Sequence, residues 1–249
     1  MPGDSIPASR ALLKYGSTMR TRVALVTGFE PYGGRGINPS AEVVRRVDGL
    51  QIEGAQVVGR VLPVSFAPLQ ARIRALVEDI EPEVVVALGL WPGEPMIRLE
   101  RLALNLADFE IPDNDGLMLR DDLVDASGTP AVPATLPLRA IETALLQGGI
   151  PARLSTTAGT FLCNATLYSF LSAAGARPGS GGVPACGFIH LPYLPGQVAG
   201  LLEDLRKERR LEQHQRADLA SMSLATMVEA VRIALAVSLT RAEPAPRPT

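Results

Sequence analysis

Two short apolar runs constrain the fold of this chain more than any other feature. Residues 23–27 and 83–89 consist mostly of valine, alanine and leucine, and a glycine, Gly28 or Gly89, stands at the end of each run. Apolar runs of this length that end at a turn residue are typical of buried strands. A chain of 249 residues, 47% of them hydrophobic, can bury such strands in a sizeable core.

Helical patterns separate the strand patterns in the first third of the chain. Asn38 is suited to cap a helix with Pro39 in its first position, and apolar residues recur at helical spacing through residue 47. Residues 56–64 alternate as a strand does, and residues 67–80 carry a helical apolar stripe. The order strand, helix, strand, helix, strand predicts a layered α/β fold with a largely parallel sheet and a site in the loops after its strands.

The rest of the chain continues the alternation of strands and helices. The patterns predict a strand at 97–105, a helix at 138–147, a strand at 152–156, a helix at 160–174, a loop at 175–182, a strand at 184–191 and a helix at 219–239. We expect one α/β domain over residues 21–240. We expect residues 1–20 to be an N-terminal extension, disordered or the product of a mis-assigned start with Met19 as the native one, and residues 241–249 to be a disordered tail.

Composition and charge exclude several classes of partner. Lys and Arg total 24 against 26 Asp and Glu, a net charge of -2, which gives no basic field for a phosphate backbone, so we expect no nucleic-acid partner. Two cysteines and two histidines cannot supply a zinc-finger ligand set or a disulfide framework. No apolar run reaches the length of a membrane span, and no signal peptide is evident. A reducing cytoplasm and no membrane association are therefore expected.

Cys163 is the candidate nucleophile. If Thr160 caps the helix predicted from residue 160, Cys163 lies in the first helical turn, where free backbone N–H groups and the helix dipole stabilise a thiolate and lower the thiol pKa. The alternative is a small buried core cysteine, which is the commoner state of a free thiol. Cys186 lies inside a predicted strand without polar neighbours, and we assign it to the core.

A base and its orienting group can be sought among few residues. His190 ends a predicted strand that opens into a Pro-rich loop, whereas His214 lies in a polar stretch and is expected at the surface. Glu100, in the alternating segment 97–105, is the best candidate to orient the imidazole, with Asp113 and Asp115 as alternatives in a turn sequence. The Gly-rich loop at 28–34 lacks the ending of a phosphate-binding loop and fits a pocket wall better.

Four separated segments together resemble the pyroglutamyl peptidase I family, also called pyrrolidone carboxyl peptidases. They are Thr27-Gly-Phe-Glu-Pro-Tyr-Gly-Gly34, Glu100-Arg-Leu-Ala-Leu-Asn105 with Ile111-Pro-Asp-Asn114, Ala158-Gly-Thr-Phe-Leu-Cys-Asn164, and Gly187-Phe-Ile-His-Leu-Pro-Tyr193. The resemblance implies a three-layer α/β/α sandwich, often tetrameric, so we expect a homotetramer or a dimer. It also implies a cysteine peptidase that removes N-terminal pyroglutamyl residues from small peptide or amide substrates, without a metal or cofactor.

The same resemblance assigns residue roles. The catalytic cysteine, histidine and glutamate would be Cys163, His190 and Glu100. The pocket for the lactam ring would be lined by Phe29, Tyr32 and Phe161, with Asn38 near it.

Three positions depart from the family pattern. Leu90 stands where the family usually has Gln, and Glu94 and Glu110 stand where it usually has Arg. If both glutamates face the pocket, they oppose the stabilisation of developing negative charge. Arg98 stands at a position that is not normally basic in the family, and it could pair with one of the two glutamates. Two alternatives therefore stay open: a diverged amidase for another small amide or lactam, and a non-catalytic binding protein of the same fold.

Overall fold

A computed structural model describes residues 21–175, 184–208 and 219–241 of the chain. Several expectations fall on residues outside these ranges and are not addressed by the structure. They are the N-terminal extension with Met19 as its alternative start, most of the loop at 175–182, the surface position of His214 and the disordered tail.

Eight strands of the described chain form one sheet. The strands are β1 (Arg22–Phe29), β2 (Gln51–Ile52), β3 (Ala55–Leu62), β4 (Val84–Leu90), β5 (Ile97–Leu104), β6 (Ala131–Pro133), β7 (Ala152–Thr157) and β8 (Ala185–Leu191). They follow the order β2, β3, β1, β4, β8, β5, β6, and β7 also pairs with β5. The pairs joining β3, β1, β4 and β8 are parallel, as is β5 with β7. The predicted largely parallel sheet is confirmed; the antiparallel pairs are β2 with β3, β5 with β6, and β5 with β8.

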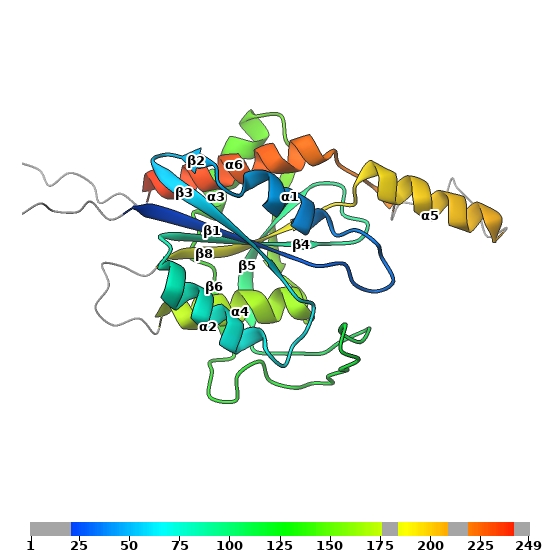
Figure 1. Cartoon of the computed structure of the whole chain (residues 1–249), viewed down its shortest axis with the longest axis horizontal. Helices are drawn as coiled ribbons and strands as arrows, with labels where there is room; N and C mark the ends of the chain where they lie inside the picture. The colour runs from blue at the N-terminus through cyan, green and yellow to red at the C-terminus, as the bar shows by residue number, and fades with distance from the viewer. Residues whose placement is uncertain (1–20, 176–183, 209–218, 242–249) are drawn as a thin grey trace, which may run out of the picture.

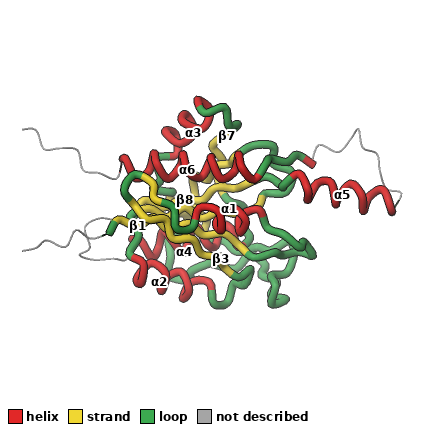
Figure 2. Tube along the Cα trace, turned by 45° about the horizontal axis from the view of Figure 1, so that its top comes forward, coloured by secondary structure: helices red, strands yellow, loops and turns green. Residues whose placement is uncertain are grey.

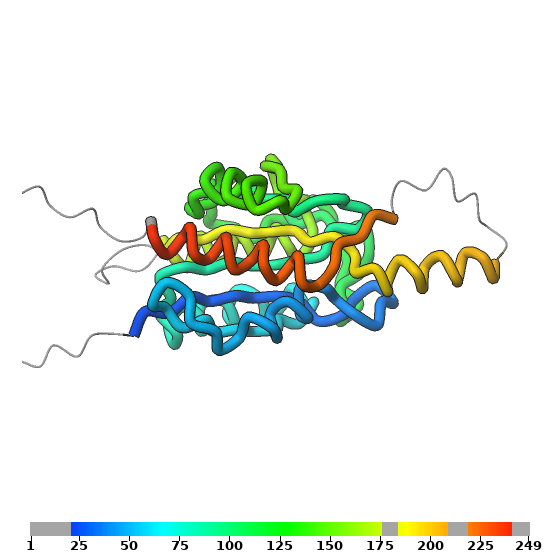
Figure 3. Tube along the Cα trace, turned by 90° about the horizontal axis from the view of Figure 1, so that it is seen from above, coloured from blue at the N-terminus to red at the C-terminus, as the bar shows by residue number. Residues whose placement is uncertain are grey.

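Helices cover both faces of this sheet (Figure 1). The helices are α1 (Pro39–Val47), α2 (Leu69–Ile80), α3 (Leu138–Gln147), α4 (Leu162–Gly175), α5 (Pro195–Lys207) and α6 (Leu224–Arg241). The apolar side chains of α1, α3 and α6 form one buried cluster with the sheet, and those of α2 and α4 form a second. Seen from above, α6 lies along the sheet with α1 and α3 on either side of it (Figure 3). The three-layer α/β/α arrangement expected from the resemblance is confirmed.

Some elements differ from their predicted bounds. The last helix starts at Leu224 rather than 219, because Ser223 Oγ accepts a hydrogen bond from the backbone N–H of Thr226, and Met222 N–H donates to the carbonyl of Tyr193. Strands β2 and β6 and helix α5 were not predicted. Helix α5 extends away from the body of the molecule and buries only Val198 among its own residues (Figures 1 and 2).

The parallel strands bring their carboxyl ends to one edge of the sheet. In β4 and β8, Gly89 pairs with His190 near that edge. Because β5 is antiparallel to β8, its first residues lie at the same edge, and Arg98 pairs with His190. This is the place where an α/β sheet presents ligand-binding groups.

Candidate active site

Strand geometry places His190 and Glu100 on one face of the sheet. Arg98 lies opposite His190, and Glu100 lies two residues further along β5, where side chains return to the same face. The side chains of His190 and Glu100 are 1% and 0% exposed. The imidazole Nδ1 lies 2.8 Å from Oε1 of Glu100. The predicted glutamate and histidine are therefore in direct contact.

This contact determines which nitrogen of His190 is free. A carboxylate only accepts hydrogen bonds, so Nδ1 carries the proton and Nε2 keeps its lone pair. Burial lowers the pKa of His190 below its ordinary value, and the positive charge of Arg98 adds to this effect, whereas the hydrogen bond and charge of Glu100 oppose it. The resting imidazole is thus a neutral base at neutral pH.

Cys163 is the second residue of α4 and shares a cavity with His190. A methyl group built on Gly89 would lie 2.8 Å from the Cys163 sulfur, so the missing side chain of this glycine gives the thiol its place against the sheet. The expectation of a lowered thiol pKa is wrong. Burial and the negative charge of Glu100 raise the pKa of Cys163 to about 12, and the helical backbone N–H only partly offsets them. The site therefore holds a neutral thiol and a neutral imidazole.

The start of α4 also differs from the prediction. The helix begins at Leu162, and the hydroxyl of Thr160 donates to the carbonyl of Asp108 at 2.7 Å instead of capping the helix. The neighbouring Asn164 is fully buried; its amide N–H₂ donates to the carbonyl of Leu104 at 2.8 Å and its oxygen accepts from the same residue's N–H at 2.8 Å. We did not predict from the sequence that Asn164 fixes the start of α4 to the backbone of Leu104, although Asn164 ends the motif that contains Cys163.

A cavity of about 430 Å³ opens beside the thiol and the imidazole. Its walls are aromatic and aliphatic side chains, with charged groups and the loop before α4: Tyr32, Arg35, Leu90, Trp91, Pro92, Asp108, Glu110, Ile111, Ala158, Gly159, Thr160, Phe161, Cys163 and His190. The rings of Tyr32 and Phe161 lie 5.9 Å apart between centroids. Both were expected in this position.

Phe29 and Asn38 are not among the residues that line the cavity. Phe29, expected to line the lactam pocket, is 3% exposed and belongs to the buried cluster that contains the apolar side chains of α2 and α4. Asn38 caps α1 by accepting from the N–H of Ser40 and donates to the carbonyl of Glu30 at 3.0 Å. Asn38 was expected only near the pocket, and it supports the loop that carries Tyr32, a residue of the cavity wall.

Glu94 and Glu110, the two glutamates that stand where the resemblance implies arginines, have different surroundings. Glu94 is 4% exposed and forms two hydrogen bonds with Arg153, at 3.0 and 2.7 Å, so it does not add a free carboxylate to the cavity. Glu110 is exposed and lies on the cavity wall. Leu90 also lies on this wall, although its side chain is buried. Arg98 pairs with Glu94, as anticipated, but it also donates from Nε to Glu100 at 2.7 Å.

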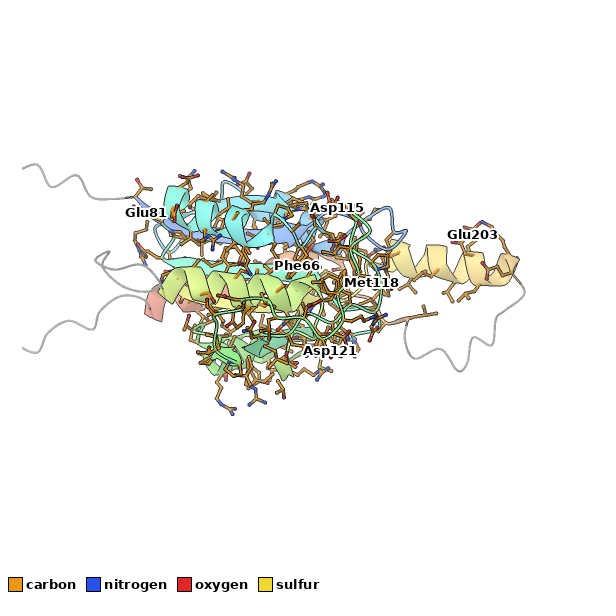
Figure 4. The ribbon with its side chains drawn as sticks, turned by 90° about the horizontal axis from the view of Figure 1, so that it is seen from below. Phe66, Glu81, Asp115, Met118, Asp121 and Glu203 are labelled. Carbon is orange, nitrogen blue, oxygen red and sulfur yellow. The ribbon has the colours of Figure 1, made fainter. Side chains whose placement is uncertain are left out.

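The alternative carboxylates shape a turn instead of orienting His190. Asp113 accepts hydrogen bonds from the backbone N–H groups of Phe66, Asp115 and Leu117. Asp115 accepts from the hydroxyl of Ser65. This turn belongs to the long segment between β5 and β6, on the side of the molecule that carries α2 and α4 (Figure 4). Among the residues that the structure describes, Glu100 is therefore the carboxylate that contacts His190.

The described residues offer no set of three or more His, Cys, Asp or Glu side chains placed to hold a metal ion. Nor does any helix in the described ranges have the length and apolarity to cross a membrane.

A thiol and a buried carboxylate-bound imidazole that share a cavity at the strand ends of an α/β sheet define a candidate site for nucleophilic cysteine catalysis. The Pyroglutamyl peptidase family model matches residues 22–241, and the chain belongs to this family. The family expected from the four motifs is confirmed, and with it the class of cysteine-type omega peptidases.

Named relatives agree with this assignment. The chain is 40% identical over 216 residues to the pyrrolidone-carboxylate peptidase of Thermococcus litoralis, covering 86% of this chain and 92% of that protein. It is 40% identical over 215 residues to that of Klebsiella pneumoniae, with 86% and 92% covered. The crystal structure of pyrrolidone carboxyl peptidase from Pyrococcus furiosus superposes with a TM-score of 0.80 at 36% identity, covering 89% of this chain and 100% of that one.

Replacing Gly89 with alanine is expected to damage the site. The added methyl would meet the Cys163 sulfur and the Phe188 ring, each at 2.8 Å, and both are held by packing. We expect kcat/KM for an amide substrate to fall by about tenfold to a hundredfold, since a displacement of about 1 Å at a reacting group has effects of this size. Gly36→Ala is the control, because a methyl there meets no atom within 4 Å. Equal activity of the two variants would contradict the tight fit.

Proposed function

We propose that the protein is a cysteine-type omega peptidase that removes an N-terminal pyroglutamyl residue from peptides. The observation that carries the proposal is the 2.8 Å contact between His190 and Glu100 in a cavity that also contains Cys163. The relatives that match 86% of this chain are named pyrrolidone-carboxylate peptidases. This name denotes the same activity.

The chemistry follows from the protonation states of these three groups. Nε2 of His190 accepts the thiol proton as the Cys163 sulfur attacks the carbonyl carbon of the scissile amide. Glu100 stabilises the imidazolium that forms, and the imidazolium returns the proton to the leaving amine as the C–N bond breaks. A water molecule, deprotonated by His190, then attacks the thioester and releases the acid and the free thiol.

The cavity suits a small lactam. A pyroglutamyl ring is flat and partly apolar, and Tyr32 and Phe161 supply aromatic surface on the cavity wall against which such a ring can pack. Leu90 cannot donate a hydrogen bond to the tetrahedral oxyanion, and Glu110 carries the wrong charge for it. Backbone N–H groups at the start of α4 remain to stabilise that oxyanion, as helix N-termini do.

A fluorogenic pyroglutamyl amide tests the function directly. We expect release of the fluorophore from this substrate and none from the corresponding prolyl amide, whose ring lacks the lactam carbonyl. The same leaving group in both substrates isolates recognition of the lactam. Hydrolysis of neither amide, or of both at equal rates, would exclude a pyroglutamyl peptidase.

We also propose that the protein works in the cytoplasm. Cys163 and Cys186 are both free thiols, and the chemistry requires the first of them to stay reduced. A reducing compartment maintains that state. Fractionation of the native cells should place the protein in the cytoplasmic fraction, and recovery from the medium or periplasm would refute this.

A homo-oligomer, a dimer or a tetramer, is the quaternary structure that we propose. Helix α5 extends from the body with Leu201 exposed and Leu202 and Leu205 half-buried, and such a helix gains stability by packing against another copy. Light scattering coupled to size-exclusion chromatography should give two or four times 26.4 kDa. A monomer mass at micromolar concentration would contradict it.

A further inference from the structure

A row of alternating charges leads from the edge of the sheet to His190. The guanidinium of Arg153 donates to Glu94 from Nε at 3.0 Å and from Nη2 at 2.7 Å. Nη1 of Arg98 lies 3.6 Å from the Glu94 carboxylate, and Nε of Arg98 donates to Oε1 of Glu100 at 2.7 Å. The same Oε1 contacts Nδ1 of His190. Arg98 is thus the positive charge next to the carboxylate that holds the imidazole.

The sheet register makes this row a consequence of the fold. Arg98 lies opposite His190 on β8 and opposite Arg153 on β7, so these three side chains cross one face of three adjacent strands. Glu100 is on the same face two residues later. The side chain of Arg98 is 12% exposed. Its charge is therefore screened much less than that of a surface arginine.

Arg98 is held in place from several sides. Its Nε also donates to Oγ of Ser155 at 2.9 Å, and its Nη2 donates to the carbonyl of Thr157 at 3.2 Å. The guanidinium carbon lies 3.7 Å from the centroid of the Trp91 ring, and that ring meets His190 edge-on at 4.9 Å. A planar guanidinium fixed by stacking and hydrogen bonds loses little further freedom when it orients a carboxylate.

We propose that Arg98 is a positioning residue of this active site, an inference that rests on the proposed function. Its guanidinium holds the Glu100 carboxylate in line with Nδ1 of His190. Its positive charge opposes protonation of the imidazole, so that Nε2 stays available to accept the thiol proton. Glu94, fixed by Arg153, keeps the guanidinium over Trp91.

The need for such a group follows from the Glu100 carboxylate beside the imidazole. A lone carboxylate beside a buried histidine favours the imidazolium, and an imidazolium cannot deprotonate a thiol. Burial is the largest effect that lowers the pKa of His190, and the positive charge of Arg98, held against Glu100, adds to it. The other titratable or charged groups that contact His190 or share its cavity are Glu100, Glu94, Cys163, Tyr32, Arg35, Asp108 and Glu110.

Variants that separate charge from hydrogen bonding test the proposal. In Arg98→Met, kcat/KM for a pyroglutamyl amide at pH 7 should fall by about tenfold to a hundredfold, since a displacement of about 1 Å at a catalytic group has effects of this size. The acid limb of the pH profile should move to higher pH, because His190 is protonated more easily. Arg98→Lys keeps the charge, so its acid limb should stay in place while its turnover falls. Arg98→Gln removes the charge but keeps an N–H donor. It replaces Arg98→Met in the same measurements if the methionine variant does not fold.

Arg101→Met is the matched control. Arg101 is on the same strand but on the opposite face of the sheet, and it does not line the cavity. Its removal should leave the acid limb unchanged. If neither Arg98→Met nor Arg98→Gln moves the acid limb, and activity falls equally at every pH, Arg98 has only a structural role and the proposal is wrong. Unchanged activity in both variants would also overturn it.

A second measurement does not depend on the substrate. The imidazole Cε1–H resonances of the two histidines can be titrated by NMR, with a His214→Asn variant to assign the His190 signal. We expect Arg98→Met to raise the titration midpoint of His190 and Arg98→Lys to leave it unchanged. If the wild-type enzyme does not cleave pyroglutamyl amides, the proposed function fails, but this titration still decides whether Arg98 controls the imidazole.

Discussion

Cys163→Ser is expected to lower kcat/KM for a pyroglutamyl amide by about 10⁴-fold or more, the range seen when a nucleophile that acts with its base is removed. A serine hydroxyl is far harder to deprotonate than a thiol, and the neutral imidazole of His190 was matched to the thiol. The oxygen is also smaller than sulfur, so it fills less of the space beside Gly89 that the sulfur occupies. Initial rates with a fluorogenic pyroglutamyl amide measure the effect.

Cys186→Ala is the control for this substitution. Cys186 is 0% exposed on β8 and is absent from the cavity wall, so its replacement should change stability but leave kcat/KM nearly unchanged. Thermal melting of all three proteins establishes that they are folded. A Cys163→Ser enzyme that retains more than about a tenth of wild-type kcat/KM would show that another group attacks the amide.

Core elements could be predicted from the sequence because their signals are local. The valine-rich run that forms β4 is buried along its whole length, and the apolar stripe of α2 faces the core through Leu69, Ile73 and Val77. Helix α5 has apolar residues at helical spacing, but only Val198 among them is buried, and this helix was not predicted from the sequence. Strands β2 and β6 have two and three residues, too few for a periodic signal.

The site could be predicted only as a set of residue types. Motifs identified the thiol, the imidazole and the glutamate, and Arg98 is close enough in sequence to be anticipated as a partner of Glu94, but the other partner of Glu94 is distant. Arg153, 59 residues later, reaches Glu94 through the pairing of β5 with β7. The error in the pKa of Cys163 has the same origin: a local argument from the helix start ignored burial by β4 and β8, which dominates.

Glu100→Gln tests the remaining member of the site and should have the second-largest effect. We expect kcat/KM to fall by about 10² to 10⁴-fold, the upper end being the loss found when an amide replaces the carboxylate of a triad. The amide can present its N–H₂ to Nδ1 of His190, which puts the imidazole proton on Nε2 and removes the acceptor for the thiol proton. Nitrogen-15 NMR of the imidazole should report this change of tautomer.

The same substitution leaves Arg98 with a neutral neighbour. Removing one partner of a buried ion pair costs up to about 3–5 kcal/mol, so the melting temperature should fall as well. Glu83→Gln is the control, because Glu83 pairs with Arg22 in a half-exposed ion pair just before β4, at the opposite end of that strand from the cavity. If Glu100→Gln kept the wild-type tautomer and kcat/KM, the carboxylate would not orient the base. A loss of activity with the wild-type tautomer would mean that Glu100 acts mainly by stabilising the imidazolium.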